Sequence, residues 1–173
     1  MLAALLALQS TLAAPVDPAP LVAGRWVFRE TREFGTGARA VSATLLARDG
    51  TSRLVVRCDL SYQRDISIQF LSTKPGNPVV TPPAKLGWAG AAKAFPLRWE
   101  QGPIGIFARN GRKKQPATAV VEAMRGSPGL LAMRSSNRVK GAVAVEFDNR
   151  EDRDQLRRVL AACAPPGSGA AAS

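Results

Sequence analysis

The chain has 173 residues, of which 46% are hydrophobic and 21% are charged. This length fits one domain of ordinary size, and the composition excludes the polar, aromatic-poor class of disordered chains. The 24 Lys and Arg residues outnumber the 13 Asp and Glu residues, and the net charge of +11 favours contact with polyanions. Because the basic residues are spread along the whole chain, a compositional bias toward Arg is the alternative interpretation.

The first residues, 1–13, have the pattern of a secretory signal peptide. Leu2 to Leu8 form an unbroken apolar run, and the small residues Thr11 and Ala13 favour cleavage after Ala13. The run is too short to span a bilayer, which takes about 20 apolar residues, and no later stretch is long enough. We therefore expect a periplasmic or secreted protein without a transmembrane segment. A buried N-terminal helix or a loose tail is the alternative, since no Lys or Arg precedes the run.

After the signal peptide, the pattern predicts a Pro-rich spacer (14–23), a single β-rich domain (24–164) and a disordered tail (165–173). The domain begins with segments in which apolar and polar residues alternate, joined by turn signals such as Asp49-Gly50. The strands predicted there are Arg25 to Thr31, Ala40 to Arg48, Arg53 to Asp59 and Asp65 to Leu71. The last three form an antiparallel meander.

The second half of the chain mixes strands with two helices. Four prolines make Lys74 to Pro83 a surface loop. Helical spacing predicts a short middle helix, Ala117 to Arg125, and a C-terminal helix capped by Asn149. The further predicted strands are Ala94 to Glu100, Ile104 to Arg109, Gly129 to Arg134 and Gly141 to Phe147. The fold class is therefore α+β, mostly antiparallel β, arranged as a sandwich or a partly open barrel.

Cys58 and Cys163 are the two cysteines, and an even count in an exported chain favours a disulfide over a metal site. Alternation with Leu54 and Val56 points Cys58 toward the core. Cys163 ends an apolar pattern at helical spacing that begins at Leu156, which places it on the buried face of the last helix. We predict a disulfide that locks this helix to a strand. Two free thiols in a cytosolic chain are the alternative.

The sequence contains no histidine, which removes the commonest general base and the most frequent zinc ligand. We predict no catalytic site, no cofactor and no metal site. Acidic residues gather only from Asp148 to Asp154, where paired carboxylates could cleave glycosidic bonds. Because arginines alternate with them at a helix start, ion pairs and capping are the favoured interpretation. A carboxylate-based hydrolase of cell-wall or polysaccharide substrates is the alternative function.

Two features are candidate binding residues. Arg112, Lys113 and Lys114 follow a turn and could contact an acidic polymer, although such a group is also typical of a solvated loop. Trp88 lies in a stretch rich in Gly and Ala that gives it little reason to be buried, whereas a core or rim position is the usual place for a tryptophan.

Several structural features occur together between Gly24 and Cys163. They are a Trp-containing first strand, the A.L....G...LVVRC hairpin from Ala43 to Cys58, the ISIQF strand from Ile66 to Phe70, and a VEF strand followed by the last helix. In this order the chain resembles the VasI-like small periplasmic proteins associated with type VI secretion.

The resemblance implies an exported cell-envelope accessory or interaction protein without catalytic activity. A more specific expectation is that the protein is associated with a secretion system. The expected partner is an envelope protein or an acidic envelope polymer. Nucleic acid is not expected as a partner of an exported chain.

Overall fold

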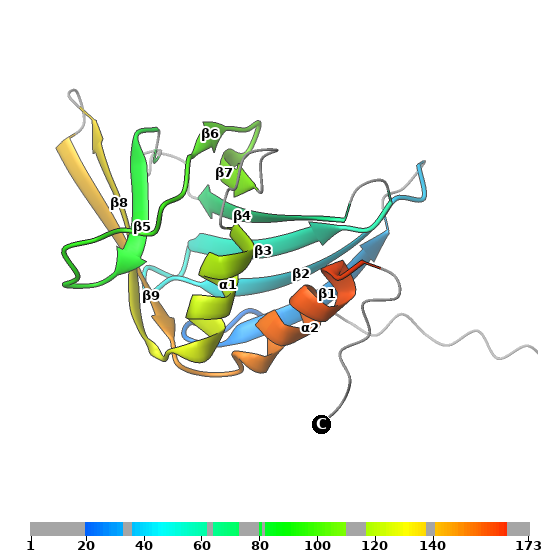
Figure 1. The fold of residues 1–173 in the computed structure, drawn as a ribbon. Helices are drawn as coiled ribbons and strands as arrows, with labels where there is room; N and C mark the ends of the chain where they lie inside the picture. Colours follow the sequence, from blue (N-terminus) through cyan, green and yellow to red (C-terminus); the bar gives the residue numbers. More distant parts are fainter. Residues whose placement is uncertain are drawn as a thin grey trace, which may run out of the picture.

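The computed structural model describes residues 20–32, 36–61, 64–72, 80, 82–109, 117–137 and 141–165. Within them, nine strands form two antiparallel sheets accompanied by two helices (Figure 1). The larger sheet has the order β1-β2-β3-β4-β7-β6 and the smaller one β5-β8-β9. The predicted α+β class with mostly antiparallel strands is confirmed. The elements are β1 (Trp26–Arg32), β2 (Arg39–Leu46), β3 (Ser52–Asp59), β4 (Asp65–Ser72), β5 (Ala84–Trp88), β6 (Glu100–Gln101), β7 (Gly105–Arg109), α1 (Ala117–Gly126), β8 (Gly129–Asn137), β9 (Gly141–Asn149) and α2 (Asp154–Cys163).

Several predicted segments lie outside the described residues. They include the signal peptide 1–13, residues 14–19 of the spacer and residues 166–173 of the tail. Of the predicted surface loop from Lys74 to Pro83, only three residues are described. Pro82 and Pro83 are exposed, whereas Val80 is buried against the core.

The hairpin of β2 and β3 turns at Asp49-Gly50, as predicted. Gly50 has φ +72°, in the left-handed region that favours glycine. The Asp49 carboxylate accepts hydrogen bonds from the backbone N–H groups of Thr51 and Ser52, both at 2.8 Å. Partial burial raises the pKa of Asp49, but these hydrogen bonds outweigh it and hold the pKa below its ordinary value. The turn is therefore fixed by a charged side chain that remains ionised at neutral pH.

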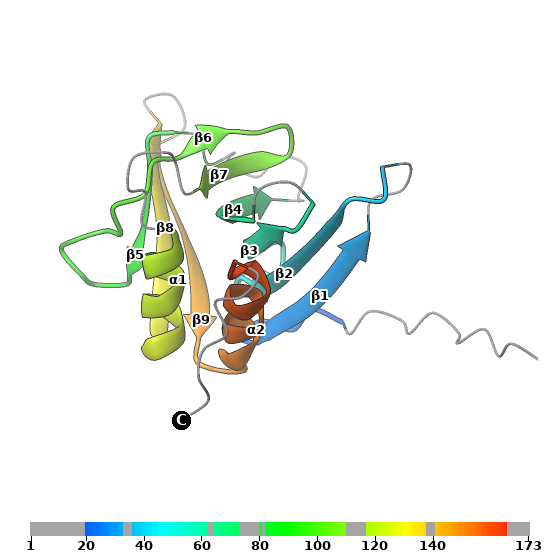
Figure 2. The ribbon, with the colours of Figure 1, turned by 45° about the vertical axis from the view of Figure 1, so that its right-hand side comes forward.

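One face of the larger sheet forms the core, because buried apolar residues recur at every second position of its strands. Leu54, Val56 and Cys58 of β3 have no exposed surface, as their alternation predicted. Both helices lie against this face (Figure 2). Phe70 of β4 meets Phe147 of β9 edge to face, with ring centroids 6.1 Å apart. The two sheets therefore share one apolar interior.

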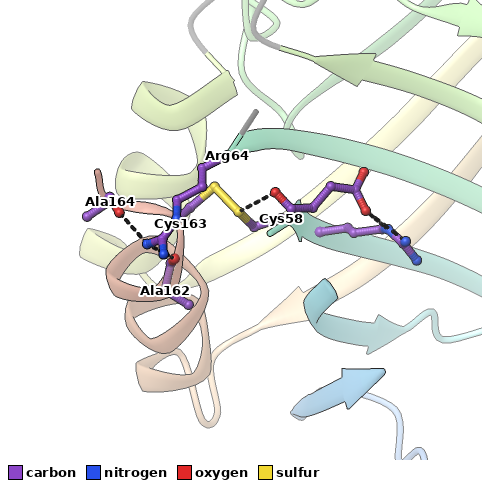
Figure 3. Close-up of a disulfide and its surroundings, with 7 residues drawn as sticks. Cys58, Arg64, Ala162, Cys163 and Ala164 are labelled. Carbon is purple, nitrogen blue, oxygen red and sulfur yellow. Dashed lines mark hydrogen bonds and ion pairs between the residues drawn. A yellow bond between two sulfur atoms is a disulfide. The ribbon is translucent and has the colours of Figure 1, made fainter. Parts of the chain in front are cut away.

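The predicted disulfide joins Cys58 of β3 to Cys163 at the end of α2, with the two Cα atoms 5.8 Å apart (Figure 3). Arg64 stabilises the same junction, because its guanidinium donates hydrogen bonds to the carbonyls of Ala162 at 3.1 Å and Ala164 at 2.7 Å. The positive charge of Arg64 at this position also interacts favourably with the negative end of the helix dipole. The C-terminal end of α2 is thus held covalently and electrostatically. No helix of the described residues is long and apolar enough to cross a membrane.

The predicted strand from Ala94 to Glu100 is wrong. Residues 91–99 are irregular, and only Glu100 and Gln101 enter a strand. Phe95, Leu97 and Trp99 alternate with exposed residues because they pack toward the apolar interior, and this spacing imitates a strand. The strand that was not predicted, β5, precedes this segment and ends at Trp88.

The predicted N-cap role of Asn149 is also wrong. Helix α2 begins at Asp154, and its N-cap residue, Arg153, makes no capping hydrogen bond through its side chain. Asn149 instead ends β9 with a fully buried side chain. Its amide accepts a hydrogen bond from Trp26 Nε1 at 2.7 Å and donates to the Met124 carbonyl at 2.7 Å. Asn149 therefore joins β1 to the end of α1.

Candidate functional site

A pocket of about 480 Å³ lies beside Trp88, between the three-stranded sheet and residues 91–97. Its floor is the sheet face that points away from the core. On that face Lys85 of β5 lies opposite Arg134 of β8, and Gly87 lies opposite Ala132. The volume is typical of small-molecule sites.

The chain after β5 folds back over the sheet to build the pocket wall. The backbone N–H of Phe95 donates to the Leu86 carbonyl at 2.8 Å, which ties the returning segment to β5. A Cβ atom at Gly87 would lie 3.0 Å from Ala94 Cα and 3.3 Å from the Lys93 carbonyl oxygen. Glycine at position 87 therefore permits the close approach that brings Lys93 to the pocket.

Trp88 is one of the residues that line the pocket, and its partly buried side chain packs against the core cluster. It packs beside Gly129, where a Cβ atom would lie 3.2 Å from the indole Cε3 and Cζ3 atoms. The Phe95 ring meets it edge to face, with centroids 5.9 Å apart and an angle of 73° between the planes. Trp88 is thus held in one place by Gly129 and Phe95, and its role as a binding residue stays a prediction.

Positive charge is concentrated around the pocket. Lys85, Lys93 and Arg134 line it and are exposed, and no carboxylate among the described residues forms an ion pair with any of them. Glu146, diagonal to Arg134 across β8 and β9, is engaged by Arg48 at 3.4 Å. Like charges directly opposite each other in a sheet destabilise it. An anion between Lys85 and Arg134 would remove this repulsion.

In comparisons with known proteins, no family model, no curated protein and no solved structure matches the chain. The VasI-like relationship therefore stays a prediction, and the pocket has to be interpreted from its own geometry.

The other predicted site residues lie elsewhere. Arg112, Lys113 and Lys114 are outside the described residues. The sequence analysis missed Lys85, Lys93 and Arg134. Two of these lie within five residues of Trp88 in the chain, so basic residues flanking an unexplained tryptophan were an available signal. Arg134 becomes a neighbour only through the pairing of β5 with β8.

The acidic group from Asp148 to Asp154 is engaged in ion pairs. Asp148 lies 3.5 Å from Arg150 and 3.9 Å from Arg48, and Arg25 contacts both Glu151 at 3.6 Å and Asp152 at 2.9 Å. None of these carboxylates lines the pocket beside Trp88. In the described part of the chain, no group of three or more His, Cys, Asp or Glu residues could hold a metal ion. The geometry favours the ion-pair interpretation of this segment, although capping by Asn149 is not part of it.

A second pair of carboxylates, Asp59 and Asp65, lies directly opposite across β3 and β4. Burial raises the pKa of Asp65, the nearby positive charge of Arg109 opposes this, and the Asp59 carboxylate adds to the increase. Asp59 is bound by Arg57 at 2.8 Å. This pair lies outside the pocket lining, so it offers no substrate site there.

Proposed function

We propose that this chain is an exported cell-envelope protein, periplasmic or secreted, that binds an acidic partner and has no catalytic activity. The observation that carries the proposal is the pocket beside Trp88, which is lined by three cations, Lys85, Lys93 and Arg134, without an ion-pair partner among the described residues. The disulfide between two distant positions of the chain supports export, because such bonds persist in oxidising compartments.

Binding at the pocket follows from its electrostatics. Several cations around a concave site focus their field and raise the local concentration of anions. Each hydrogen bond from Lys or Arg to a carboxylate or phosphate is shorter and stronger than a neutral one. The partner is an acidic envelope polymer or the acidic surface of an envelope protein, and an accessory role in secretion is the narrower form of the proposal.

Export is tested by the intact mass of the protein from its native host, with and without reduction before thiol alkylation. We expect a chain shortened by residues 1–13, with Cys58 and Cys163 alkylated only after reduction. Recovery of the full-length chain with two freely alkylated thiols would contradict export and make nucleic acid the first partner to test.

Binding at the pocket is tested with two double variants that remove equal charge. Lys85→Ala/Arg134→Ala removes the pair in the pocket, whereas Arg32→Ala/Arg39→Ala removes a like-charged cross-strand pair at the far end of β1 and β2. The probes are immobilised polygalacturonate, polyglutamate and polyphosphate. We expect the pocket variant to bind at least one polymer about tenfold more weakly or worse, since each charged hydrogen bond contributes about 1.5–3 kcal/mol.

The control variant should bind within about twofold of the unmodified protein at moderate ionic strength, where distant surface charges are largely screened. Equal losses in the two double variants would mean that binding comes from diffuse charge, and the proposed site would be wrong.

A further inference from the structure

We infer that the open face of the six-stranded sheet, the face turned away from the two helices, binds an acidic polysaccharide in which charged and neutral sugar units alternate. The inference goes beyond the proposed function, because it concerns a second surface and not the pocket beside Trp88. Two features of the sheet carry it: a row of residues that crosses the strands, and an apolar strip beside that row.

The apolar strip lies on the side of the larger sheet that points away from both helices (Figure 2). Val27, Thr44 and Val55 lie directly opposite one another there, and each is 8% exposed although none of them belongs to the core cluster. Arg29 and Arg53 flank the two valines on the same strands, and the Nε atoms of both are buried, so these side chains lie along the sheet. Cations held in this way lose less conformational freedom when a ligand binds.

Cations and hydroxyl groups alternate across the same face. The strand pairing puts one residue each of β1, β2, β3, β4 and β7 in a single line, which we call the arginine row: Arg29, Ser42, Arg57, Ser67 and Arg109. Neighbouring strands are about 4.8 Å apart, so the three arginines recur at roughly 10 Å. Beside the end of the row lies Phe107, with its ring centroid 4.7 Å from the Arg109 guanidinium carbon. The row therefore presents regularly spaced charge along an apolar and aromatic border.

A polysaccharide with alternating charge matches the arginine row in spacing and in chemistry. One sugar unit of a linear polysaccharide is about as long as the distance between neighbouring strands, so every second unit meets an arginine. Guanidinium groups bind carboxylates through two parallel hydrogen bonds. The hydroxyl groups of Ser42 and Ser67 lie where the neutral units pass, and they can hydrogen-bond to sugar hydroxyls. The apolar strip can cover the C–H groups of the same chain.

Two carboxylates border the arginine row on the side opposite to the apolar strip. Asp59 and Asp65 face each other across β3 and β4, and Arg57 contacts Asp59 at 2.8 Å. Both partners of this ion pair are well exposed, and such surface pairs are weak, so an incoming carboxylate can share the Arg57 guanidinium. The two aspartates repel an anion on their own side. They therefore direct the ligand toward the apolar strip.

An acidic peptide fits the arginine row less well. Side chains on one side of an extended peptide recur at about 7 Å, so its carboxylates fall out of step with arginines that are about 10 Å apart. A peptide would also lay backbone polar groups on the apolar strip, where Val27 and Val55 offer them no hydrogen-bond partner. The spacing and the strip together favour the sugar chain.

The experiment measures by calorimetry the affinity of the full chain for hyaluronate oligosaccharides, in which carboxylated and neutral units alternate. Polyglutamate with the same number of charges is the comparison probe. Ser67→Glu places a carboxylate between Arg57 and Arg109, and Ala161→Glu adds the same charge on the exposed side of α2 as the matched control. In case Ser67→Glu folds poorly, Arg57→Ser/Arg109→Ser removes two cations and introduces the residue type already present in the row.

We expect both variants of the arginine row to weaken hyaluronate binding about tenfold or more, and Ala161→Glu to leave it within about twofold. Polyglutamate should bind the unmodified chain at least about tenfold more weakly than hyaluronate. Lys85→Ala/Arg134→Ala should change the affinity for hyaluronate by less than about threefold, since the pocket contributes no residue to the row.

Absence of measurable hyaluronate binding, or equal losses in Ser67→Glu and Ala161→Glu, would overturn the inference. Equal affinity for polyglutamate would overturn it as well, because charge alone would then explain binding. A loss in Lys85→Ala/Arg134→Ala alone would overturn the inference and leave the proposed function standing. Losses of binding to every acidic polymer that are confined to the row variants would support the arginine row and contradict the proposed pocket.

Discussion

The double variant Cys58→Ala/Cys163→Ala is expected to lose about 4 to 5 kcal/mol of its free energy of unfolding. The disulfide joins residues 105 positions apart, and on the chain-entropy account it removes many conformations from the unfolded chain. Because such a loss approaches the whole stability of many domains, much of the variant could be unfolded at 37 °C. Urea unfolding followed by circular dichroism, with and without the substitutions, measures the difference.

Two controls separate the covalent link from its surroundings. Reducing the unmodified protein should lower the free energy of unfolding as much as the double substitution does. Arg64→Ala should cost only about 1 kcal/mol, since it removes hydrogen bonds from an exposed guanidinium to the carbonyls of Ala162 and Ala164. A loss below 1 kcal/mol in the double variant would mean that packing alone holds α2 to β3.

Asn149→Ala is expected to lower the free energy of unfolding by about 3 to 4 kcal/mol. The substitution leaves the Trp26 indole N–H without its acceptor inside the core. It also removes the donor to the carbonyls of Met124 and Ser127, which lie 2.7 and 3.0 Å from the Asn149 amide nitrogen. A buried polar group without a partner costs about 1–3 kcal/mol, and this change creates more than one.

The matched variant is Trp26→Phe, which keeps an aromatic ring and removes only the N–H that Asn149 accepts. We expect a loss of about 1–3 kcal/mol for this variant alone. In the double variant the two losses should fall short of additive by about 1 kcal/mol or more, because the residues share one hydrogen bond. Strict additivity would show that the bond does not link β1 to β9 energetically.

The alternating strands were predictable from the sequence because one face of each is buried. Cys58 follows Leu54 and Val56 at a spacing of two, and this spacing alone directs all three side chains to the core. The turn at Asp49-Gly50 was predictable because Asp-Gly is itself a local signal for a hairpin turn. These signals belong to single segments, so no knowledge of distant partners was needed.

Errors arose where distant parts of the chain decide the structure. Phe95, Leu97 and Trp99 alternate like a strand, but residues 91–99 form no ladder with β5, although the Phe95 N–H donates to the Leu86 carbonyl. Asn149 has the residue type of a helix cap, yet the buried indole N–H of Trp26 competes for its side chain. In both cases tertiary contacts override a local preference.

In the candidate site too, local signals were visible in the sequence, whereas contacts between distant parts of the chain were not. Trp88 could be selected from the sequence because its surroundings offered no reason for burial. The charged pair of Lys85 and Arg134 depends on the register between β5 and β8, which a single sequence does not reveal. The role of Gly87 likewise depends on the segment that returns over it.

The link between the first and last strands has a consequence for how the chain acquires its structure. Strands β1 to β4 pair with sequence neighbours and can assemble while the chain is still growing. Their apolar face, however, is covered mainly by α2, and Trp26 finds its hydrogen-bond partner only in Asn149. In the nascent chain, one apolar face of this sheet therefore remains exposed until the C-terminal residues have been synthesised. Closure of the fold therefore depends on Asn149 and α2, which lie near the C-terminal end of the domain.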